Sequence, residues 1–549
     1  MTELFLGFGL AFSDLHEPAG LGRLDALFLE QLGLGDPGLA DRLRDARAAP
    51  DALEKKDESA LLIALAPHLE DFIGTLFGIS AELRALAGRH HALAPLFTVK
   101  RLFVQRRAAK AVKPDAVAGL DGDALAAELE ALIGGPLDEL SFARAVAAWM
   151  DAEAGHAAEL DLAARYAAWA LLTEAGRARH GKGVLFQVPH KTDPEHLVPV
   201  ETIEVPGGRH GIPAMRLPLH DRRLRDGFDL TDQGTDLKGA LDQANYCIWC
   251  HNQGKDSCSG GLHDRKTGAY QKSPFGVTLA GCPLEEKISE MHTLKAEGVP
   301  VGALAMIVVD NPMCAATGHR ICNDCMKACI YQKQQPVDIP QAETRTLKDV
   351  LDLPWGFEIY SLLTRWNPLD IRRPLMKPAS GYKVLVVGLG PAGFTLAHHL
   401  MNDGHTVVGI DGLKIEPVPA DLSGVLPSGK RVPFRPIHDI ADLCDRLDER
   451  VMAGFGGVAE YGITVRWNKN FLKMIRLLLE RRQQFVMVGG VRFGGTITPE
   501  DAFAAGFDHV ALCAGAGKPT VLDMPNGLAR GVRAASDFLM ALQLTGAAK

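Results

Sequence analysis

Eight of the ten cysteines in this 549-residue chain lie between residues 247 and 329. Short C-x-x-C and C-x-x-x-C loops place two thiolates on one metal corner and direct backbone amides at the sulfurs. In a reducing compartment, clustered cysteines are metal ligands more often than disulfides. Eight thiolates are enough for two four-iron clusters, although two all-cysteine zinc sites would use the same residues. The eight candidates are Cys247, Cys250, Cys258, Cys282, Cys314, Cys322, Cys325 and Cys329.

A glycine-rich turn follows the cysteines and is suited to a dinucleotide. The hydrophobic run Val384–Val387 predicts a buried strand, and Phe394–Asn402 predicts a helix whose N-terminus faces a pyrophosphate. Thr406–Ile410 predicts the next strand, and Asp411 at its end can accept hydrogen bonds from a ribose diol but would repel a 2′-phosphate. The turn itself has the pattern G-x-G-x-x-G and contains Gly388, Gly390, Pro391, Ala392 and Gly393.

Composition bounds the class of protein. Apolar residues make up 47% and charged residues 23%, which is ordinary for a soluble globular protein. A net charge of −8 without a long run of like charge argues against nucleic-acid binding as the main function. No run approaches the ~18–20 apolar residues of a membrane helix, and the N-terminus lacks the features of a signal peptide. We therefore expect a cytoplasmic protein.

The elements that position these residues predict a multidomain fold of the α + α/β class. Residues 1–183 are rich in Ala and Leu with helical periodicity, and predict a helical N-terminal domain of unknown role. Residues 184–235 predict a connector with short strands, and residues 236–345 an α-helical domain for two [4Fe-4S] clusters. Residues 346–380 form a linking segment. Residues 381–549 predict a partial Rossmann-like domain, the first half of an FAD-binding fold.

The cysteine runs and the glycine-rich turn together resemble the iron–sulfur flavoprotein module of the glutamate synthase small subunit, which also forms the N-terminal part of dihydropyrimidine dehydrogenase. The resemblance covers roughly residues 236–545. It implies a flavoprotein of the FAD-dependent pyridine nucleotide-disulfide oxidoreductase type, with FAD rather than NAD at the turn. It also implies that one cluster is held by Cys247, Cys250, Cys258 and Cys329. The second cluster would use Cys282, Cys322 and Cys325.

The fourth ligand of the second cluster is left open by the sequence. In the family a carboxylate or amide seven residues after a proline completes this cluster, and Glu343 after Pro336 matches that pattern. Cys314 is then a surplus thiol, or it replaces Glu343 as the ligand. The spacing also departs from the family, because an inserted loop, Ser259–Ala280, must leave and return without disturbing Cys282.

The resemblance implies two further flavin-binding segments, and it also implies an NAD(P)H domain that this sequence does not contain. A loop beside the isoalloxazine is implied at Gly456, Gly457, Gly462 and Ile463. The glycine motif that closes the first half of the FAD domain is implied at Gly515 and Gly517. In the family an NAD(P)H domain follows that motif, but no second glycine-rich strand–turn–helix is present here. We expect a longer chain or a separate polypeptide to supply it, or the module to have lost direct nicotinamide oxidation.

The sequence thus predicts an enzyme, an NAD(P)H-linked oxidoreductase module. It would move electrons between NAD(P)H bound elsewhere, FAD and two [4Fe-4S] clusters, and exchange them with a partner enzyme or domain. We assign no catalytic nucleophile or acid–base pair. One alternative is a non-catalytic electron-relay or assembly subunit; a weaker one is a zinc-scaffolded interaction protein. Neither nucleic-acid binding nor membrane insertion is expected.

Overall fold

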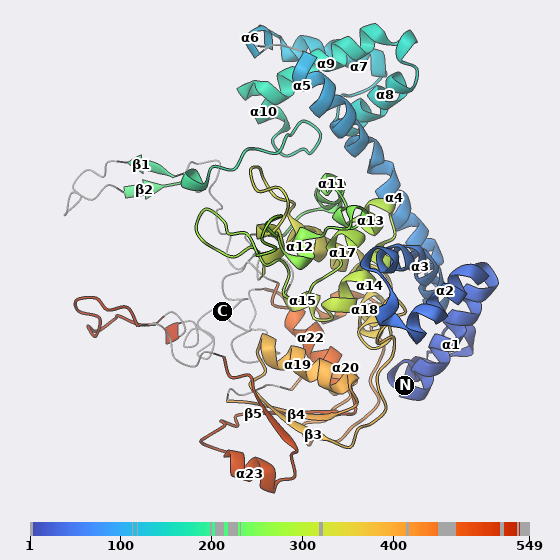
Figure 1. Cartoon of the computed structure of the whole chain (residues 1–549), viewed down its shortest axis with the longest axis vertical. Coiled ribbons are helices and arrows are strands. Elements are labelled where there is room, and N and C mark those ends of the chain that lie inside the picture. The colour runs from blue at the N-terminus through green and yellow to red at the C-terminus, as the bar shows by residue number, and fades with distance from the viewer. Residues whose placement is uncertain are drawn as a thin grey trace.

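The computed structural model describes residues 4–111, 114–117, 119–197, 200–203, 214–217, 229–230, 232–317, 322–412, 415, 417–447, 468–515, 521–534 and 537–538. Three parts follow one another along the long axis: a helical bundle, a central helical region with the cysteines, and a small sheet with its helices (Figure 1). The expectation of a mixed fold with an N-terminal helical domain and a small parallel sheet is confirmed.

The first helices lie beside the central region. Prolines occupy the first turn of both α1 and α2, where a missing N–H costs nothing, and α3 stops at Gly78, which takes the left-handed conformation with φ 70°. The elements are η1 (Gly7–Gly9), η2 (Phe12–His16), α1 (Pro18–Gly35), α2 (Pro37–Ala48), η3 (Pro50–Ala52), α3 (Lys55–Phe77) and α4 (Ser80–Val99).

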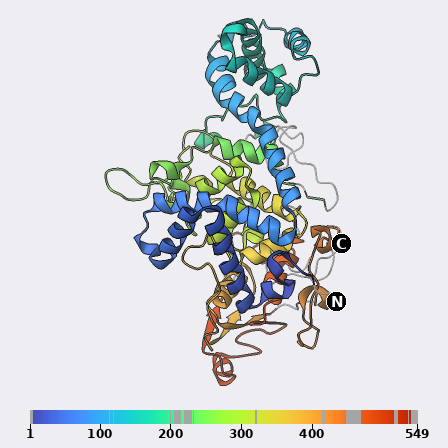
Figure 2. The ribbon, with the colours of Figure 1, turned by 90° about the vertical axis from the view of Figure 1, so that its right-hand side faces the viewer.

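The helical bundle is joined to this body through α4, which continues directly into a π-helix, η4; the two form one long connection (Figures 1 and 2). The bundle consists of η4 (Lys100–Ala108), α5 (Ala109–Ala111), α6 (Pro114–Val117), α7 (Gly122–Ile133), α8 (Glu139–Asp151), η5 (Glu153–Gly155), α9 (Ala157–Leu172) and α10 (Glu174–His180). A connector follows, with η6 (Pro194–His196) and the antiparallel pair β1 (Glu201–Ile203) and β2 (Ala214–Arg216).

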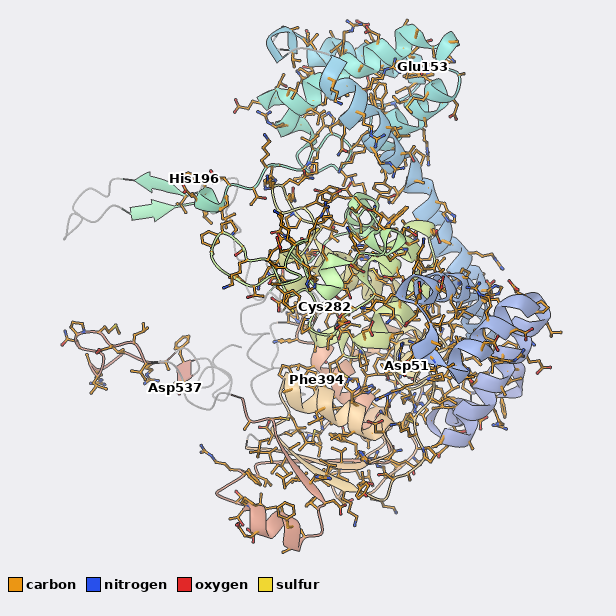
Figure 3. All side chains as sticks on the ribbon, in the orientation of Figure 1. Asp51, Glu153, His196, Cys282, Phe394 and Asp537 are labelled. Carbon is orange, nitrogen blue, oxygen red and sulfur yellow. The ribbon has the colours of Figure 1, made fainter. Side chains whose placement is uncertain are left out.

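The central region is helical and carries all eight clustered cysteines. Its elements are α11 (Leu237–Tyr246), η8 (Cys250–Gln253), α12 (Ser257–Gly260), α13 (Ile288–Glu297), α14 (Pro300–Asp310), α15 (Cys314–Thr317), α16 (Asp324–Lys327), α17 (Ile339–Leu351) and α18 (Gly356–Leu363). Cys282 lies in this region, and Phe394 lies on α19 at the edge of the sheet part (Figure 3).

The sheet has four parallel strands in the order β5-β4-β3-β6. This is the order of the first half of a doubly wound sheet, in which the first strand lies in the middle. The elements are β3 (Lys383–Val387), α19 (Pro391–Asn402), β4 (Thr406–Asp411), α20 (Ala420–Ser423), η9 (Ile440–Leu443), α22 (Phe471–Glu480), β5 (Phe485–Gly489), α23 (Pro499–Ala504) and β6 (His509–Leu512).

The described residues form four hydrophobic clusters, of which two are large. One joins side chains of α1–α3, of the central helices and of the sheet part into a single cluster, so the first three helices share a core with both later regions. Glu70 on α3 strengthens this junction, because its Oε2 accepts hydrogen bonds from the Val301 and Gly302 amides at the start of α14, at 2.8 and 3.4 Å. The second core lies inside the bundle and extends to Leu241 on α11.

Within the described residues one helix, α3, is long and apolar enough to cross a membrane by length and composition alone. Of its most apolar window, 61% is buried inside the protein, and its inner face belongs to the larger core. The burial is that of a core helix.

Candidate functional site: two groups of thiols and a glycine-rich turn

Four cysteines from distant positions in the sequence line one small cavity. Cys247 follows the end of α11, Cys250 begins η8, Cys258 lies on α12, and Cys329 comes just after α16. We call these four residues the first thiol site. The turn between the first two is made by Trp249, which takes the left-handed conformation with φ 52°. The structure therefore brings together the four cysteines that the family resemblance assigns to one cluster.

Backbone amides point at the sulfurs of this site. The Trp249 amide donates to Cys247 Sγ at 3.4 Å. Burial has the largest effect on the pKa of Cys250 and Cys329 and raises it, whereas nearby amides lower it: Ser257 acts on Cys250, and Ile330, Tyr331 and Val337 act on Cys329. Such bonds stabilise negative charge on sulfur, and they are one of the means by which proteins tune iron–sulfur centres.

Burial acts in the opposite direction on the same thiols. Removal from water raises the pKa of Cys247 to about 12 and that of Cys250 to about 11, and it raises the pKa of Cys258 well above its usual value. A thiolate is therefore costly here unless a positive ion compensates it, which is what a metal centre does. His292 also lines the cavity; it is fully buried, and neither ring nitrogen has a hydrogen-bond partner among the described residues.

A second group of thiols lies next to the first. The Cys282 amide donates to the carbonyl oxygen of Cys258 at 2.8 Å, which ties the two groups through the backbone. The inserted loop leaves and returns at this point, because a Cβ at Gly281 would lie 2.5 Å from the Gly261 nitrogen and from the Ser259 carbonyl oxygen. The first and last residues of the insertion therefore lie against each other just before Cys282.

Two buried carboxyl groups share the space of the second group. Burial is the largest cause that raises the pKa of Cys282, Cys322 and Cys325, and the Glu343 and Glu286 carboxylates raise it further at all three, so both acids lie within electrostatic reach of these thiols. Each acid also has its own pKa raised by burial, that of Glu286 to about 7. We call Cys282, Cys322, Cys325 and Glu343 the second thiol site.

Cys314 lies beside this site in a different environment. It begins α15, and its sulfur lies 3.6 Å from the hydroxyl oxygen of Tyr360, which is itself fully buried and donates to the Pro312 carbonyl oxygen at 2.8 Å. The Asn311 side chain donates to Glu343 Oε1 at 3.2 Å. Burial and the nearby Glu343 carboxylate both raise the pKa of the Cys314 thiol. The geometry thus pairs Cys314 with a tyrosine.

All ten cysteines are free. Within the part of the chain that the structure describes, no three His, Cys, Asp or Glu side chains converge closely enough to hold a single metal ion. The first cavity measures ≈ 10 Å³, so it holds little beyond its own lining. Outside both sites, Cys444 is exposed and Cys513 is half-buried.

The glycine-rich turn packs closely at two of its three glycines and is open at the third. Gly388 has φ 93°, and a Cβ there would lie 2.5 Å from the Cys513 carbonyl oxygen. A Cβ at Gly393 would lie 1.8 Å from the Gly388 carbonyl oxygen, so the helix contacts the turn too closely for any other residue. A Cβ at Gly390 would instead meet nothing within 4 Å, because this glycine borders open space at the start of α19. Pro391 and Ala392 form the first turn of that helix.

Asp411 ends β4 as expected, but it already has a role in the fold. Its side chain is 8% exposed, and its Oδ2 accepts a hydrogen bond from the Leu389 amide at 3.1 Å. Gly515 follows β6 with φ 70°. The other flavin-binding residues expected from the sequence, Gly456, Gly457, Gly462, Ile463 and Gly517, lie outside the described residues.

Two site residues escape sequence reasoning. Glu286 shares the second thiol site, yet it stands in an ordinary charged stretch, Leu284-Glu-Glu-Lys287. His292 faces the first thiol site from α13, where a single histidine carries no motif. The only available signal is that both follow Cys282 within ten residues, near enough to fold back over the thiols.

Comparisons with known proteins place this chain beside several others. Residues 6–78 match the family model described as the RP005 N-terminal alpha-helical domain. The uncharacterized protein RP006 of Rickettsia prowazekii is 55% identical over 235 residues, which are 43% of this chain and 32% of RP006. The uncharacterized protein RP005 of the same organism is 31% identical over 306 residues, which are 53% of this chain and 98% of RP005.

More distant relatives carry a named activity. The glutamate synthase [NADPH] small chain of Mycobacterium tuberculosis is 26% identical over 265 residues, and that of Bacillus subtilis is 28% identical over 267 residues. Each match covers 47% of this chain and 42% of the relative. The chain is therefore a distant homologue of oxidoreductase subunits, and it spans less than half of their length and about a third of RP006. Because it covers nearly all of RP005 at 31% identity, the chain belongs to the RP005 family.

Proposed function

We propose that this chain is an iron–sulfur flavoprotein of the oxidoreductase class. It would exchange electrons between NAD(P)H bound outside the chain, FAD and two [4Fe-4S] clusters, and a partner enzyme or domain. FAD supplies hydride chemistry and the clusters supply one-electron transfer, while the protein supplies positions and charges. The observation that carries the proposal is the first thiol site, where four cysteines separated by up to 82 positions line one cavity.

The donors of the first thiol site suit a cluster. Soft thiolates are the usual ligands of iron–sulfur centres. Backbone amides lie close enough to act on three of the four thiols, those of Cys247, Cys250 and Cys329. His292, whose ring nitrogens have no hydrogen-bond partner in the part of the chain that the structure describes, lines the same cavity. A single tetrahedral zinc ion would require sulfurs about 3.8 Å apart, whereas a four-iron core holds its thiolates farther from one another.

For the second thiol site we propose Glu343 as the fourth ligand. Burial is the largest cause that raises the pKa of Cys282, Cys322, Cys325 and Cys314, and the Glu343 carboxylate adds to it at all four. Cys314 differs in that its sulfur also lies 3.6 Å from the Tyr360 hydroxyl oxygen. A carboxylate without a buried cation beside it is unstable in so dry a place, and Glu343 is 7% exposed. Coordination to iron would provide the missing positive charge.

The glycine-rich turn fits the pyrophosphate of FAD. Gly390 leaves space in front of the first amides of α19, where the helix dipole and the free N–H groups favour an anion. Asp411 lies at the carboxyl end of the neighbouring strand, the usual place of the acid that binds a ribose. We further propose that the protein acts in the cytoplasm and that its nicotinamide donor is bound by a separate or additional segment.

The decisive experiment is purification without oxygen, followed by iron, acid-labile sulfide, zinc and flavin analysis. We expect about eight irons and eight sulfides per chain with one FAD. Zinc without sulfide would end the proposal. Reduction of a dye by NAD(P)H, measured with the nicotinamide-binding segment supplied, then separates the two remaining hypotheses. An oxidoreductase reduces the dye, whereas an electron-relay subunit shows cluster signals in spin resonance and no such reduction.

The flavin assignment is tested separately at the turn. Gly390→Ala places a methyl group in open space, so we expect an unchanged melting temperature and a lower flavin content. Gly88→Ala on α4, where a Cβ also meets nothing within 4 Å, is the matched control and should leave flavin content unchanged. Full flavin retention by the Gly390 variant would place FAD elsewhere.

A further inference from the structure

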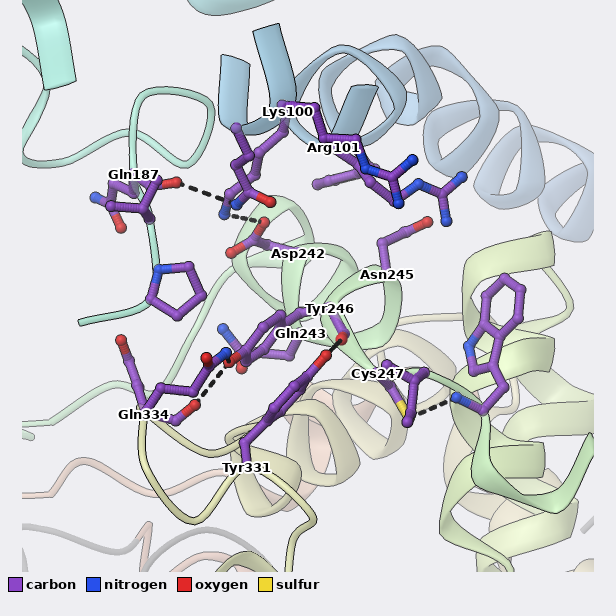
Figure 4. Close-up of a pocket in the computed structure, with 18 residues that line it drawn as sticks. Lys100, Arg101, Gln187, Asp242, Gln243, Asn245, Tyr246, Cys247, Tyr331 and Gln334 are labelled. Atoms are coloured by element: carbon purple, nitrogen blue, oxygen red, sulfur yellow. Dashed lines mark hydrogen bonds and ion pairs between the residues drawn. The ribbon is translucent and has the colours of Figure 1, made fainter. Parts of the chain in front are cut away.

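A cavity of ≈ 520 Å³ opens between the helical bundle and the cysteine region. Figure 4 shows Lys100 and Arg101 of η4 on one side, Asp242 and Asn245 of α11 beside them, and Tyr246, Tyr331 and Cys247 on the opposite side. The volume is in the range of small-molecule sites, which run from about 300 to 1,000 Å³. Nothing in the sequence motifs points to this place.

The charges on the cavity wall are mostly positive. Lys100 is neutralised by Asp242, with Nζ and Oδ1 2.6 Å apart, and this pair is largely buried. Arg101 and Arg106 also line the cavity, and both are exposed without an ion-pair or hydrogen-bond partner among the described residues. Because the whole chain carries a net charge of −8, two unpaired guanidinium groups on one wall are a local exception.

The opposite wall is flat and aromatic. The rings of Tyr246 and Tyr331 are stacked, with centroids 4.6 Å apart and planes 8° from parallel. Hydrogen bonds fix them: the Tyr246 hydroxyl donates to the Gln335 carbonyl oxygen at 2.8 Å and accepts from the Gln334 side chain at 2.6 Å. Further amide side chains line the cavity and can bind the edge of a heterocycle: Gln105, Gln187, Gln243 and Asn245.

The cationic wall belongs to an unusual element. Residues Lys100–Ala108 form a π-helix, a rare conformation that is frequently found at functional sites. Its wider winding follows directly from α4, and Gln105 Nε2 reaches the Gln187 carbonyl oxygen across the cavity at 3.5 Å. The backbone thus departs from a regular helix at the place that lines the cavity.

The cavity also adjoins the first thiol site. Three residues, Cys247, Ile248 and Tyr331, line both spaces, so a molecule in the cavity would be separated from that site by single side chains. At the other end, α15 beside the second thiol site contacts α22 of the sheet part. The sheet part, the second thiol site, the first thiol site and the cavity therefore follow one another through the molecule.

We infer that this cavity binds a small ligand with a phosphate group and a planar heterocycle, such as a mononucleotide or flavin mononucleotide. The phosphate lies against Arg101 and Arg106, and the ring lies toward the tyrosine pair. The binding itself stands on the cavity alone. The position at the end of the electron path, which makes the ligand a candidate electron carrier, rests on the proposed function.

The test is equilibrium dialysis of the full chain, purified without oxygen and saturated with FAD, against flavin mononucleotide, AMP and inorganic phosphate in turn. We expect saturable binding of at least one of the two ring-bearing ligands, tighter than that of phosphate. The double variant Arg101→Gln/Arg106→Gln should weaken it at least about tenfold, because each guanidinium loses charge-assisted bonds to phosphate. Whether flavin mononucleotide or AMP binds more tightly identifies the ring.

A matched control lies on the same long helix. Arg84→Gln/Arg89→Gln on α4 removes the same charge from exposed positions outside the cavity and should leave binding unchanged. Both double variants should keep the iron content of the unaltered chain. Absence of saturable binding, or equal binding by the two double variants, would overturn the inference. Binding of an acidic protein that needs Arg101 and Arg106, with neither ring-bearing ligand tighter than phosphate, would also overturn it.

The outcomes separate this inference from the proposed function. A chain that contains iron and sulfide but binds none of the three probes refutes the cavity site and leaves the clusters standing. A chain without sulfide that still binds a mononucleotide through the two arginines refutes the clusters and keeps the site.

Discussion

The two thiol sites are built from different materials. At the first, four cysteines are surrounded by backbone amides and apolar side chains. The one histidine there, His292, is uncharged because burial lowers its pKa to about 3. At the second, three cysteines share their space with two buried carboxyl groups, and a fourth cysteine is turned to a tyrosine. Net charge and hydrogen bonds to sulfur set the reduction potential of a cluster, so on our proposal the two sites would hold electrons at different energies.

This difference teaches that equal cysteines in a sequence are not equal ligands. The runs contain four cysteines each, but the fold takes Cys329 from the second run for the first site and leaves Cys314 aside. The exchange is possible because α12 and α16, which carry Cys258 and Cys325, lie in contact. Removing single members of each site is therefore the direct way to break the comparison.

The largest effect is expected from Cys258→Ser. This thiol is 5% exposed within the first thiol site, and a serine cannot replace a soft ligand. We expect iron and sulfide to fall by about half, because one of two four-iron centres is lost. Cys444→Ser, at an exposed thiol, is the control and should change neither. Retention of full iron by the Cys258 variant would show that the first thiol site holds no cluster.

A smaller loss is expected from Glu343→Ala, since three thiols of the second thiol site remain. Iron should fall by up to about half and the second set of spin-resonance signals should broaden or vanish. Cys314→Ala tests the alternative and should keep its iron. If the Cys314 variant loses iron and the Glu343 variant does not, the ligands of the two sites are more alike than the structure indicates.

Glu286→Gln distinguishes the two carboxyl groups of the second thiol site. Burial raises the pKa of Glu286 to about 7, and the same residue raises the pKa of the Glu343 carboxyl. The amide keeps the shape and removes this repulsion, so we expect full iron content and a cluster signal at a shifted potential, measured by redox titration. Loss of iron would make Glu286 a ligand in place of Glu343.

The smallest effect is expected from Tyr360→Phe. The hydroxyl bonds Pro312 and lies 3.6 Å from the Cys314 sulfur, and its loss leaves a buried carbonyl oxygen unpaired. The cost is about 1–3 kcal/mol, seen as a lower midpoint in chemical denaturation. Iron content should not change. A variant that is equally stable but loses iron would show that Tyr360 supports a ligand rather than the core.

Local patterns predicted much of this molecule. The strand, turn, helix and strand around Gly388–Gly393 occur in the expected order, because each is specified by neighbours in the sequence. The parallel sheet and the helical N-terminus are likewise present. The assignment of Cys329 to the first set came from family resemblance, since its own run gives no sign of it.

Long-range packing decided what the sequence left open. The helices α1–α3 share one core with the sheet part, although these residues lie hundreds of positions apart in the sequence. Glu286 reaches the second thiol site from a loop that carries no motif. The cavity beside Cys247 arises only because η4 of the bundle lies over α11. The hydrophobic periodicity of the sequence does not predict that η4 packs over α11.

The sequence by itself determined which atoms are available: eight thiols in short loops, three glycines in a turn and an acid after a strand. Those features act over a few residues, where backbone geometry dictates position. Only the tertiary structure decided which thiols meet, which of them lies beside a carboxylate or a tyrosine, and where two arginines face an open cavity. Burial and charge depend on everything that surrounds a side chain, and that is fixed only when distant segments pack together.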